Sequence, residues 1–216
     1  MKTLQLKSTQ IIFASILIAI LSQSFKENQV DIFNGKNFSG WEGDTLKTWK
    51  IQDKILWGGS LTENVPHNNF LCTKKIYRDF TLKLKFKLEN SGGFCNAGVQ
   101  FRSVRMKNPA HEIIGYQADL GPGYWGALYD ESRRNKVLAA PDSNLVKRIL
   151  KVNDWNDYEI IAVKNRIRIK INNTTTVDYT ELDSTIVQTG FIGLQVHGGG
   201  KTRVGYKNIS ISKITP

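Results

Sequence analysis

Apolar and polar residues alternate with a period of two through most of the chain. The clearest run reads DFTLKLKFKL, from Asp79 to Leu88, where every second residue is apolar and the others are Asp, Thr or Lys. Successive side chains of a β-strand point to opposite faces, so this pattern predicts a strand with one buried and one solvated face. Further strands are predicted at residues 48–52, 55–57, 70–74, 97–104, 157–162, 166–172, 175–179, 190–196 and 203–211.

Short strands separated by Gly- and Asn-containing turns, with no helical period of any length, predict an all-β fold, an antiparallel β-sandwich. Val163-Lys164-Asn165 is predicted to form a tight hairpin. The stretch from Lys107 to Val152, which contains Gly121-Pro122-Gly123, lacks the regular alternation of apolar and polar residues. It is predicted to be a system of functional loops. We see no internal repeat or linker, and expect one domain over residues 25–216.

Residues 1–24 have the layout of a secretory signal peptide. Lys2 and Lys7 precede an apolar run from Ile11 to Leu21, which is followed by Ser22-Gln23-Ser24. An uncleaved membrane anchor is the alternative, but a span needs about 20 apolar residues. We therefore expect a protein exported to the periplasm or the cell exterior, with no membrane attachment after cleavage.

The net charge is +11, and several of the basic residues fall on alternate positions of predicted strands, as at Lys83, Lys85 and Lys87. No basic patch is interleaved with stacking aromatics, so nucleic acid is not an expected partner, whereas acidic glycans or an anionic cell surface fit the charge better. Cys72 and Cys95 lack zinc-ligand spacing. A disulfide between them and two unpaired thiols both remain open.

Four segments, in order, resemble the 3-keto-disaccharide hydrolase domain family, which consists of exported bacterial sandwiches of the concanavalin A-like, laminarinase-like kind. The resemblance covers essentially the whole chain from Asp31 on, with minor departures at Cys95 and at Gly205-Tyr206. It implies a jelly roll with a polar concave face that cleaves 3-keto-glycosides or 3-keto-disaccharides, by hydrolysis or by β-elimination followed by hydration. After the opening IFNGKNFSGWEG, the segments are NSGG…GVQFRS (90–103), HEIIGYQADLGPGYWGALYDESRRNKVL (111–138), WNDYEIIAVKNRIRIKIN (155–172) and GFIGLQVHGGGKTRVGYKNISI (190–211).

Three predicted strands each carry two polar residues at alternate positions, and such residues share a face of a strand. If the strands belong to one sheet, the pairs form a single polar surface that can bind a ligand, although an ordinary solvated face is the alternative. The pairs are Gln100 with Arg102, Gln117 with Asp119, and Gln195 with His197.

Aromatic residues in the 107–152 stretch are candidates for packing against the C–H faces of sugar rings, while polar side chains bind the hydroxyls. The alternative is that they only cover the edge of the core. The predicted substrate contacts are Tyr116, Trp125, Tyr129 and Arg133, together with Gln100, Gln117 and Gln195, and Tyr124 lies beside them. Trp41, Trp49, Trp57 and Trp155 are predicted to be core residues.

Catalytic carboxylates would distinguish a sugar-cleaving enzyme from a lectin. The candidates for this role are Glu112, Asp119, Asp130 and Glu131. The acids that laminarinase-type enzymes carry at alternate positions of one strand are missing, which argues against ordinary retaining hydrolysis. The elimination that the resemblance implies needs a base, an acid and a group that holds the enolate oxygen.

We predict that Asp119, Glu131 and His197 transfer protons, while Arg102 and Gln100 hold the oxyanion. A divalent metal bound by Asp119 and His197 is an alternative for that last role, and no organic cofactor is expected. The competing functions are a non-catalytic carbohydrate-binding sandwich and a structural surface module. Convergence of the four predicted catalytic residues in one pocket would favour the enzyme. The sugar, the linkage and the oligomeric state do not follow from the sequence.

Overall fold

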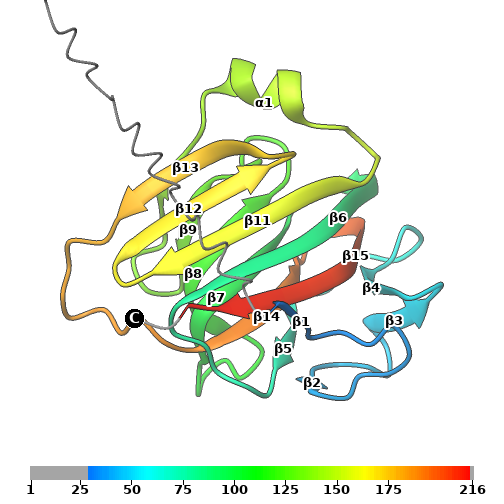
Figure 1. Cartoon of the computed structure of the whole chain (residues 1–216). Helices are drawn as coiled ribbons and strands as arrows, with labels where there is room; N and C mark the ends of the chain where they lie inside the picture. Colours follow the sequence, from blue (N-terminus) through cyan, green and yellow to red (C-terminus); the bar gives the residue numbers. More distant parts are fainter. Residues whose placement is uncertain (1–28, 215–216) are drawn as a thin grey trace, which may run out of the picture.

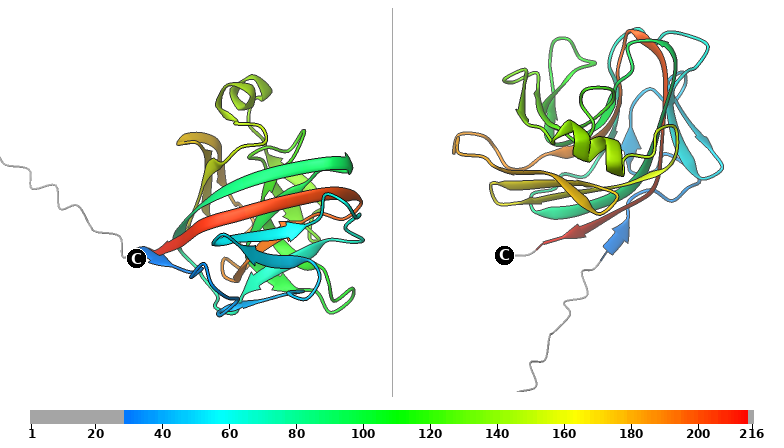
Figure 2. Two further views of the ribbon diagram at one scale, coloured as in Figure 1. Left: turned by 90° about the vertical axis from the view of Figure 1, so that its right-hand side faces the viewer. Right: turned by 90° about the horizontal axis from the view of Figure 1, so that it is seen from above.

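Two antiparallel β-sheets pack face to face in a computed structural model that describes residues 29–214 (Figure 1). The views in Figure 2 show the two layers from the side and from above. The predicted all-β sandwich is confirmed. The predicted signal peptide, residues 1–24, lies outside the described residues, and no helix among those residues has the length and hydropathy of a membrane span.

Sheet A has eight strands, and every neighbouring pair in it is antiparallel. The long central pair is β6 with β15, the last strand of the domain. In spatial order the strands are β13 (Thr174–Thr180), β12 (Arg166–Ile171), β11 (Asn156–Val163), β6 (Phe80–Gly93), β15 (Gly200–Lys213), β4 (Ile55–Gly59) and β3 (Trp49–Gln52), and β1 (Gln29–Asp31) also pairs with β15.

Sheet B has seven strands and carries the candidate site on the face turned away from sheet A. Two of its three middle strands come from the central part of the chain, and the third is the second-to-last strand of the chain. In spatial order they are β10 (Lys136–Ala139), β9 (Leu128–Glu131), β8 (Ile113–Leu120), β7 (Ala97–Arg105), β14 (Phe191–Val196), β5 (Asn69–Thr73) and β2 (Trp41–Glu42).

The core lies between the sheets and consists of the inward residues of both. Strand β6 shows how it is built, because its apolar residues from Phe80 to Leu88 are all buried, while Lys83, Lys85 and Lys87 are exposed or half-buried. Each large apolar side chain buried in this way contributes about 1.5–3 kcal/mol. The period-two prediction for this strand is therefore confirmed.

The 107–152 stretch differs from the prediction, because half of it is regular structure. It contains β8, β9, β10 and the short helix α1 (Ser143–Ile149), which is capped by the side chain of Asp142. In β8 nearly every residue is buried on either face, and apolar and polar residues alternate only from Tyr116 to Leu120. So short an alternation does not by itself predict the whole strand.

Two other expectations are settled by the packing. Cys72 and Cys95 are both free thiols, Cys72 buried and Cys95 half-buried. Trp41 and Trp49 are core residues, as predicted, but Trp57 and Trp155 are only half-buried. These two rings meet over Gly205 of β15, where a Cβ atom would come within 2.7 Å of Trp57.

Candidate functional site

Polar side chains from three neighbouring strands lie together on the outer face of sheet B. The strand register pairs Gln100 of β7 with Gln117 of β8, and places Gln195 of β14 and Asp119 of β8 on either side of Gly98. All four polar side chains are at most 3% exposed. Gly98 makes room for them, since a Cβ atom there would lie 2.7 Å from the Gln117 side chain.

Asp119 is held by one of its two carboxyl oxygens. Its Oδ1 accepts hydrogen bonds from the side chain of Asn96 at 2.8 Å, from the backbone N–H of Leu120 at 3.0 Å and from Gln117 at 3.3 Å. No described residue donates to Oδ2. The carboxyl group is thus fixed in orientation by one oxygen and leaves the other for a ligand.

The pKa values of two carboxyl groups on this face are raised to near neutrality. Burial, with a smaller contribution from the charge of Glu131, raises the pKa of Asp119 to about 7, against the lowering effect of its hydrogen bonds. Burial likewise raises the pKa of Glu131 to about 7, together with the charges of Glu112 and Asp130. With both pKa values at about 7, the two carboxyl groups together retain about one proton at neutral pH.

Buried polar atoms without partners adjoin these acids. Both side-chain atoms of the Gln195 amide, Nε2 and Oε1, and the Oε2 atom of Glu112 make no hydrogen bond in the described protein. Burying such groups unpaired is costly, so they are expected where a ligand or water completes the bonding. We call Glu112, Asp119 and Glu131, with Gln100, Gln117 and Gln195, the carboxyl cluster.

Arg102 does not belong to this cluster, which corrects the predicted pairing with Gln100. A bulge shifts the register of β7 between Phe101 and Val104, and Arg102 adopts a positive φ of 50°. Its side chain is fully buried elsewhere and bonds Asp79 at 3.0 Å. It also donates to Gln188 and to the carbonyl oxygens of Arg78 and Lys164. The guanidinium is therefore occupied by structural contacts.

Tyr116 and Arg133 likewise lie away from the predicted sugar contacts. Tyr116 is fully buried in the core, where its hydroxyl bonds Glu181 at 2.8 Å. Arg133 lies over that ring and pairs with the buried carboxylate of Asp130 at 2.6 Å. Arg134 bonds both Asp130 and Glu181. These residues form an ion-pair network that anchors β9.

Three further predicted residues, Tyr129, Trp125 and His197, lie in different surroundings. Tyr129 is half-buried and is paired in register with Gln117, so it borders the carboxyl cluster. Trp125 stacks on Phe86 and lines a separate cavity of about 420 Å³ beneath α1, which none of the cluster residues lines. His197 follows β14, and its backbone N–H bonds the carbonyl oxygen of Asn96.

The metal alternative finds no prepared ligand set in residues 29–214. No three His, Cys, Asp or Glu side chains in this range come together as ligands of one ion. His197 packs edge-on against Phe94, and its Nδ1 lies 2.7 Å from the carbonyl oxygen of Gly198. Among residues 29–214, the predicted metal ligands Asp119 and His197 are therefore not part of a set of three such side chains.

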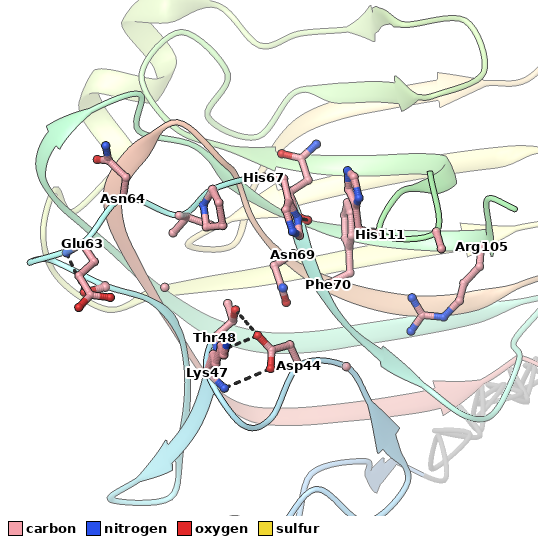
Figure 3. A pocket seen from close by; sticks show the side chains of 17 residues that line it. Asp44, Lys47, Thr48, Glu63, Asn64, His67, Asn69, Phe70, Arg105 and His111 are labelled. Atoms are coloured by element: carbon pink, nitrogen blue, oxygen red, sulfur yellow. Dashed lines mark hydrogen bonds between the residues drawn. The ribbon is translucent and has the colours of Figure 1, made fainter. Parts of the chain in front are cut away.

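A cleft of about 770 Å³ opens beside the carboxyl cluster, and we call it the His67 cleft. Asn68 links the two, because its side-chain N–H₂ donates to Glu112 Oε1 at 3.0 Å. Phe70 of β5, which lines the cleft, is the register partner of Gln195. In Figure 3, Asp44, Lys47 and Thr48 face the side chains of His67, Asn69 and Phe70 across the cleft.

The residues that join the carboxyl cluster to the His67 cleft were not predicted from the sequence as part of one site. Glu112 was a candidate acid without a location, and Asn68, Asn96 and His67 were not singled out. Glu112 lies between β7 and β8, where the backbone N–H of Met106 bonds its carbonyl oxygen and the chain reverses. An Asn or Glu in a turn gives no periodic signal, so only the folded chain brings these residues to the site.

Comparisons with known proteins agree with this architecture. The model of the 3-keto-alpha-glucoside-1,2-lyase-like domain family matches residues 28–212. A solved protein from Parabacteroides distasonis, assigned as a glycosyl hydrolase, superposes with a TM-score of 0.65 at 18% identity, covering 88% of this chain and 95% of that one. The carbohydrate-binding module CBM66 from Bacillus subtilis gives a TM-score of 0.61 at 18% identity, covering 81% of this chain and 96% of that one.

A third similar structure is a Bacillus subtilis protein of unknown function with a galectin-like fold, with a TM-score of 0.62 at 12% identity over 86% of this chain and 94% of that one. No curated protein matches the chain. At these identities the solved structures establish the sandwich fold alone.

Proposed function

The chain belongs to the 3-keto-alpha-glucoside-1,2-lyase-like domain family, and from that premise we propose that it cleaves 3-keto-glycosides at the carboxyl cluster. Membership supports a carbohydrate-related function. The specific reaction that we propose is β-elimination across C1 and C2 of the keto sugar, followed by addition of water. Export through residues 1–24 remains a prediction.

The observation that carries the proposal is the state of Asp119 and Glu131. Both have pKa values of about 7, and Asp119 keeps one oxygen free of hydrogen bonds from the described protein. A general acid or base works best with a pKa near the working pH. Two coupled carboxyl groups that share about one proton supply one base and one acid at the same pH.

The proposed reaction begins at the C2–H bond, which the neighbouring 3-keto group acidifies. The ionised carboxylate of the pair removes this proton, and the electron pair forms the C1–C2 double bond as the C1–O bond breaks. The leaving oxygen takes the proton from the other carboxyl group. Water then adds to C1 of the enone, and a proton returns to C2, which regenerates the 3-keto sugar and the starting protonation state.

The enolate oxygen needs a hydrogen-bond donor as the C2 proton leaves. Arg102 was predicted for this task, but its guanidinium is engaged with Asp79 and three other partners. We assign the task to Gln195, whose buried Nε2 makes no hydrogen bond to any residue in the range 29–214. Gln100 is less suited, because its Nε2 already donates to Gln117 at 3.2 Å.

The test is turnover of a 3-keto-glucoside by the purified protein and by variants of the cluster. Asp119→Asn keeps the shape and the acceptor oxygen, so it separates chemistry from packing. We expect turnover to fall about 10²–10⁴-fold in Asp119→Asn and in Glu131→Gln. The matched control is Asp157→Asn on sheet A, whose carboxylate pairs with Lys85 at 2.6 Å and should not affect turnover.

Unchanged turnover in both cluster variants would move the chemistry elsewhere. Absence of turnover in the wild-type protein, together with saturable binding of the keto sugar, would support the second candidate, a carbohydrate-binding module. The observation that favours this candidate is that, with Arg102 bound to Asp79, no Lys or Arg among the described residues pairs with Asp119 or Glu131.

A further inference from the structure

We infer that the outer face of sheet A binds an acidic polysaccharide, a chain of sugar rings that carry carboxylates. The site consists of Lys50, Trp57, Trp155, Arg203 and Lys207, and we call it the tryptophan platform. It belongs to the sheet opposite the carboxyl cluster, so the inference does not depend on the proposed cleavage reaction.

Two indole rings form the aromatic part of the platform. Trp57 of β4 and Trp155, which directly precedes β11, are both half-buried, and their ring centroids lie 6.0 Å apart. Gly205 of β15 makes room for both rings, because a Cβ atom there would lie 2.7 Å from Trp57 and 3.0 Å from Trp155. The ring surface that remains exposed is suited to the C–H faces of sugar rings.

The platform crosses neighbouring strands of sheet A (Figure 1). Trp57 is the register partner of Lys50 on β3 and of Gly205 on β15. Gly205 is in turn the partner of Lys87 on β6. Register partners share a face and strands lie about 4.8 Å apart, so the row from β3 to β6 is roughly 14 Å long. It is longer than one sugar ring and therefore fits a chain of sugars.

Cations lie directly over both indole rings. The guanidinium carbon of Arg203 is 4.5 Å from the ring centroid of Trp57, and Nζ of Lys207 is 3.9 Å from that of Trp155. A ligand that packs against these rings therefore meets positive charge at the same place. This combination favours a sugar that carries an anionic group over a neutral sugar.

The positive charge of this area is only partly neutralised. Glu89 pairs with Arg203 at 2.6 Å and with Lys87 at 2.9 Å, so one carboxylate serves two cations. Lys50 and Lys207 form no ion pair with any residue in the range 29–214. Two lysines without a partner, beside two half-buried indole rings, can attract the carboxylates of a ligand.

A hollow of about 300 Å³ lies at the β3–β4 end of the platform. Besides Lys50, Trp57 and Arg203, its polar lining residues are Gln52, Ser60 and Thr62. Amide and hydroxyl groups of this kind form hydrogen bonds with the hydroxyl groups of sugars. The volume is at the lower end of the range of roughly 300–1,000 Å³ typical of small-molecule sites, which suits one ring of a longer chain.

Nucleic acid is another polyanion that can bind to exposed aromatic rings and cations. The planes of the two indole rings are inclined by 54°, so they do not offer parallel faces to a stack of flat bases. The unpaired cations of the platform are lysines, whereas phosphates are commonly bound by the forked guanidinium of arginine. These two features favour the acidic polysaccharide.

The experiment measures the binding of polygalacturonate to the purified protein by isothermal titration calorimetry. Methyl-esterified polygalacturonate has the same rings without the charge, polyacrylate has carboxylates without rings, and single-stranded DNA represents nucleic acid. The variants are Trp57→Ala and the double variant Lys50→Gln with Lys207→Gln. The matched control is Lys136→Gln with Lys147→Gln, which removes the same charge from exposed residues outside sheet A.

We expect polygalacturonate to bind more tightly than each of the other three polymers. Trp57→Ala and the platform lysine variant should each weaken this binding about 10-fold, while the control variant should change it less than about 2-fold. Thermal unfolding checks the fold of each variant. If Trp57→Ala does not fold, the lysine variant decides the outcome.

Absence of binding of polygalacturonate by the wild-type protein would overturn the inference. Binding of polyacrylate, the DNA or the methyl-esterified polymer as tight as that of polygalacturonate would also overturn it, and so would equal losses in the control and platform lysine variants. None of these outcomes bears on cleavage at the carboxyl cluster, which is tested separately.

Discussion

The outer faces of the two sheets hold carboxylates in opposite surroundings. On sheet A, Asp157 pairs with Lys85 at 2.6 Å and Glu159 with Lys170 at 3.0 Å, at or near the protein surface. On sheet B, Asp119 is 3% exposed and has amide and backbone donors, but no cation of the described part of the chain lies within ion-pair distance. One face is a solvated surface, and the other is a desolvated group of acids.

This difference shows which carboxylates the fold uses for structure and which it leaves available. Exposed ion pairs contribute about 0–1 kcal/mol each, so sheet A gains little from its pairs beyond solubility. A buried carboxyl group without a cation destabilises the fold when it ionises. Perturbed acids of this kind gather at functional sites, which is why the chemistry is assigned to sheet B.

The largest expected effect is the loss of stability when a buried ion pair is broken. Arg102→Met removes a fully buried guanidinium and leaves Asp79 unpaired, so the free energy of unfolding should fall by about 3–5 kcal/mol. Urea denaturation measures this loss. A variant that remains as stable as the wild type but loses turnover would instead support the catalytic role predicted for Arg102 from the sequence.

Asp119→Asn should raise the free energy of unfolding, the opposite of the effect expected for Arg102→Met. Folding raises the pKa of Asp119 from 3.8 to about 7, so the folded state prefers the protonated acid. The penalty is absent below pH 4, grows as the pH rises to about 7, and is constant above that. We expect the variant to gain about 2–4 kcal/mol over the wild type at pH 8.

Urea denaturation at pH 4 and pH 8 measures that gain, and ¹³C NMR titration of the side-chain carboxyl groups reports the pKa of Asp119 independently. The control, Asp157→Asn, should change stability by less than about 1 kcal/mol at both pH values. If the gain in the free energy of unfolding of Asp119→Asn did not depend on pH, ionisation of the Asp119 carboxyl group would not be what destabilises the folded protein.

The smallest effect is expected on sheet A. Replacing both members of the exposed pair, Lys85→Met with Asp157→Asn, should change the free energy of unfolding by no more than about 1 kcal/mol and leave turnover unchanged. Chemical denaturation together with the keto-glucoside assay checks both expectations. A loss of turnover here would mean that the two faces do not differ in the way proposed.

Regular alternation made sheet A and the polar face of sheet B predictable. The run from Phe80 to Leu88 alternates cleanly, and Gln117 with Asp119 follows the same rule on β8. Arg102 escaped the rule because a single bulge with positive φ turns its side chain away from Gln100. A bulge depends on the pairing of whole strands, and one chain segment does not reveal it.

The His67 cleft could not be predicted at all. Its lining comes from separate stretches of the chain near residues 43–48, 59–70 and 105–111. Glu112 meets Asn68 across 44 positions of sequence. Contacts of this range depend on loops that carry no periodic signal, so they follow only from the assembled sheets.

The most direct test of proton transfer at the carboxyl cluster is cleavage of a 3-keto-glucoside in D₂O, with mass and NMR analysis of the released sugar. Elimination followed by hydration removes the C2 proton and returns one from solvent, so the account predicts a single deuterium at C2, above a control without enzyme. Asp119→Asn should abolish that label together with turnover. Release of sugar with no deuterium at C2, at the rate of the wild-type protein, would contradict the account.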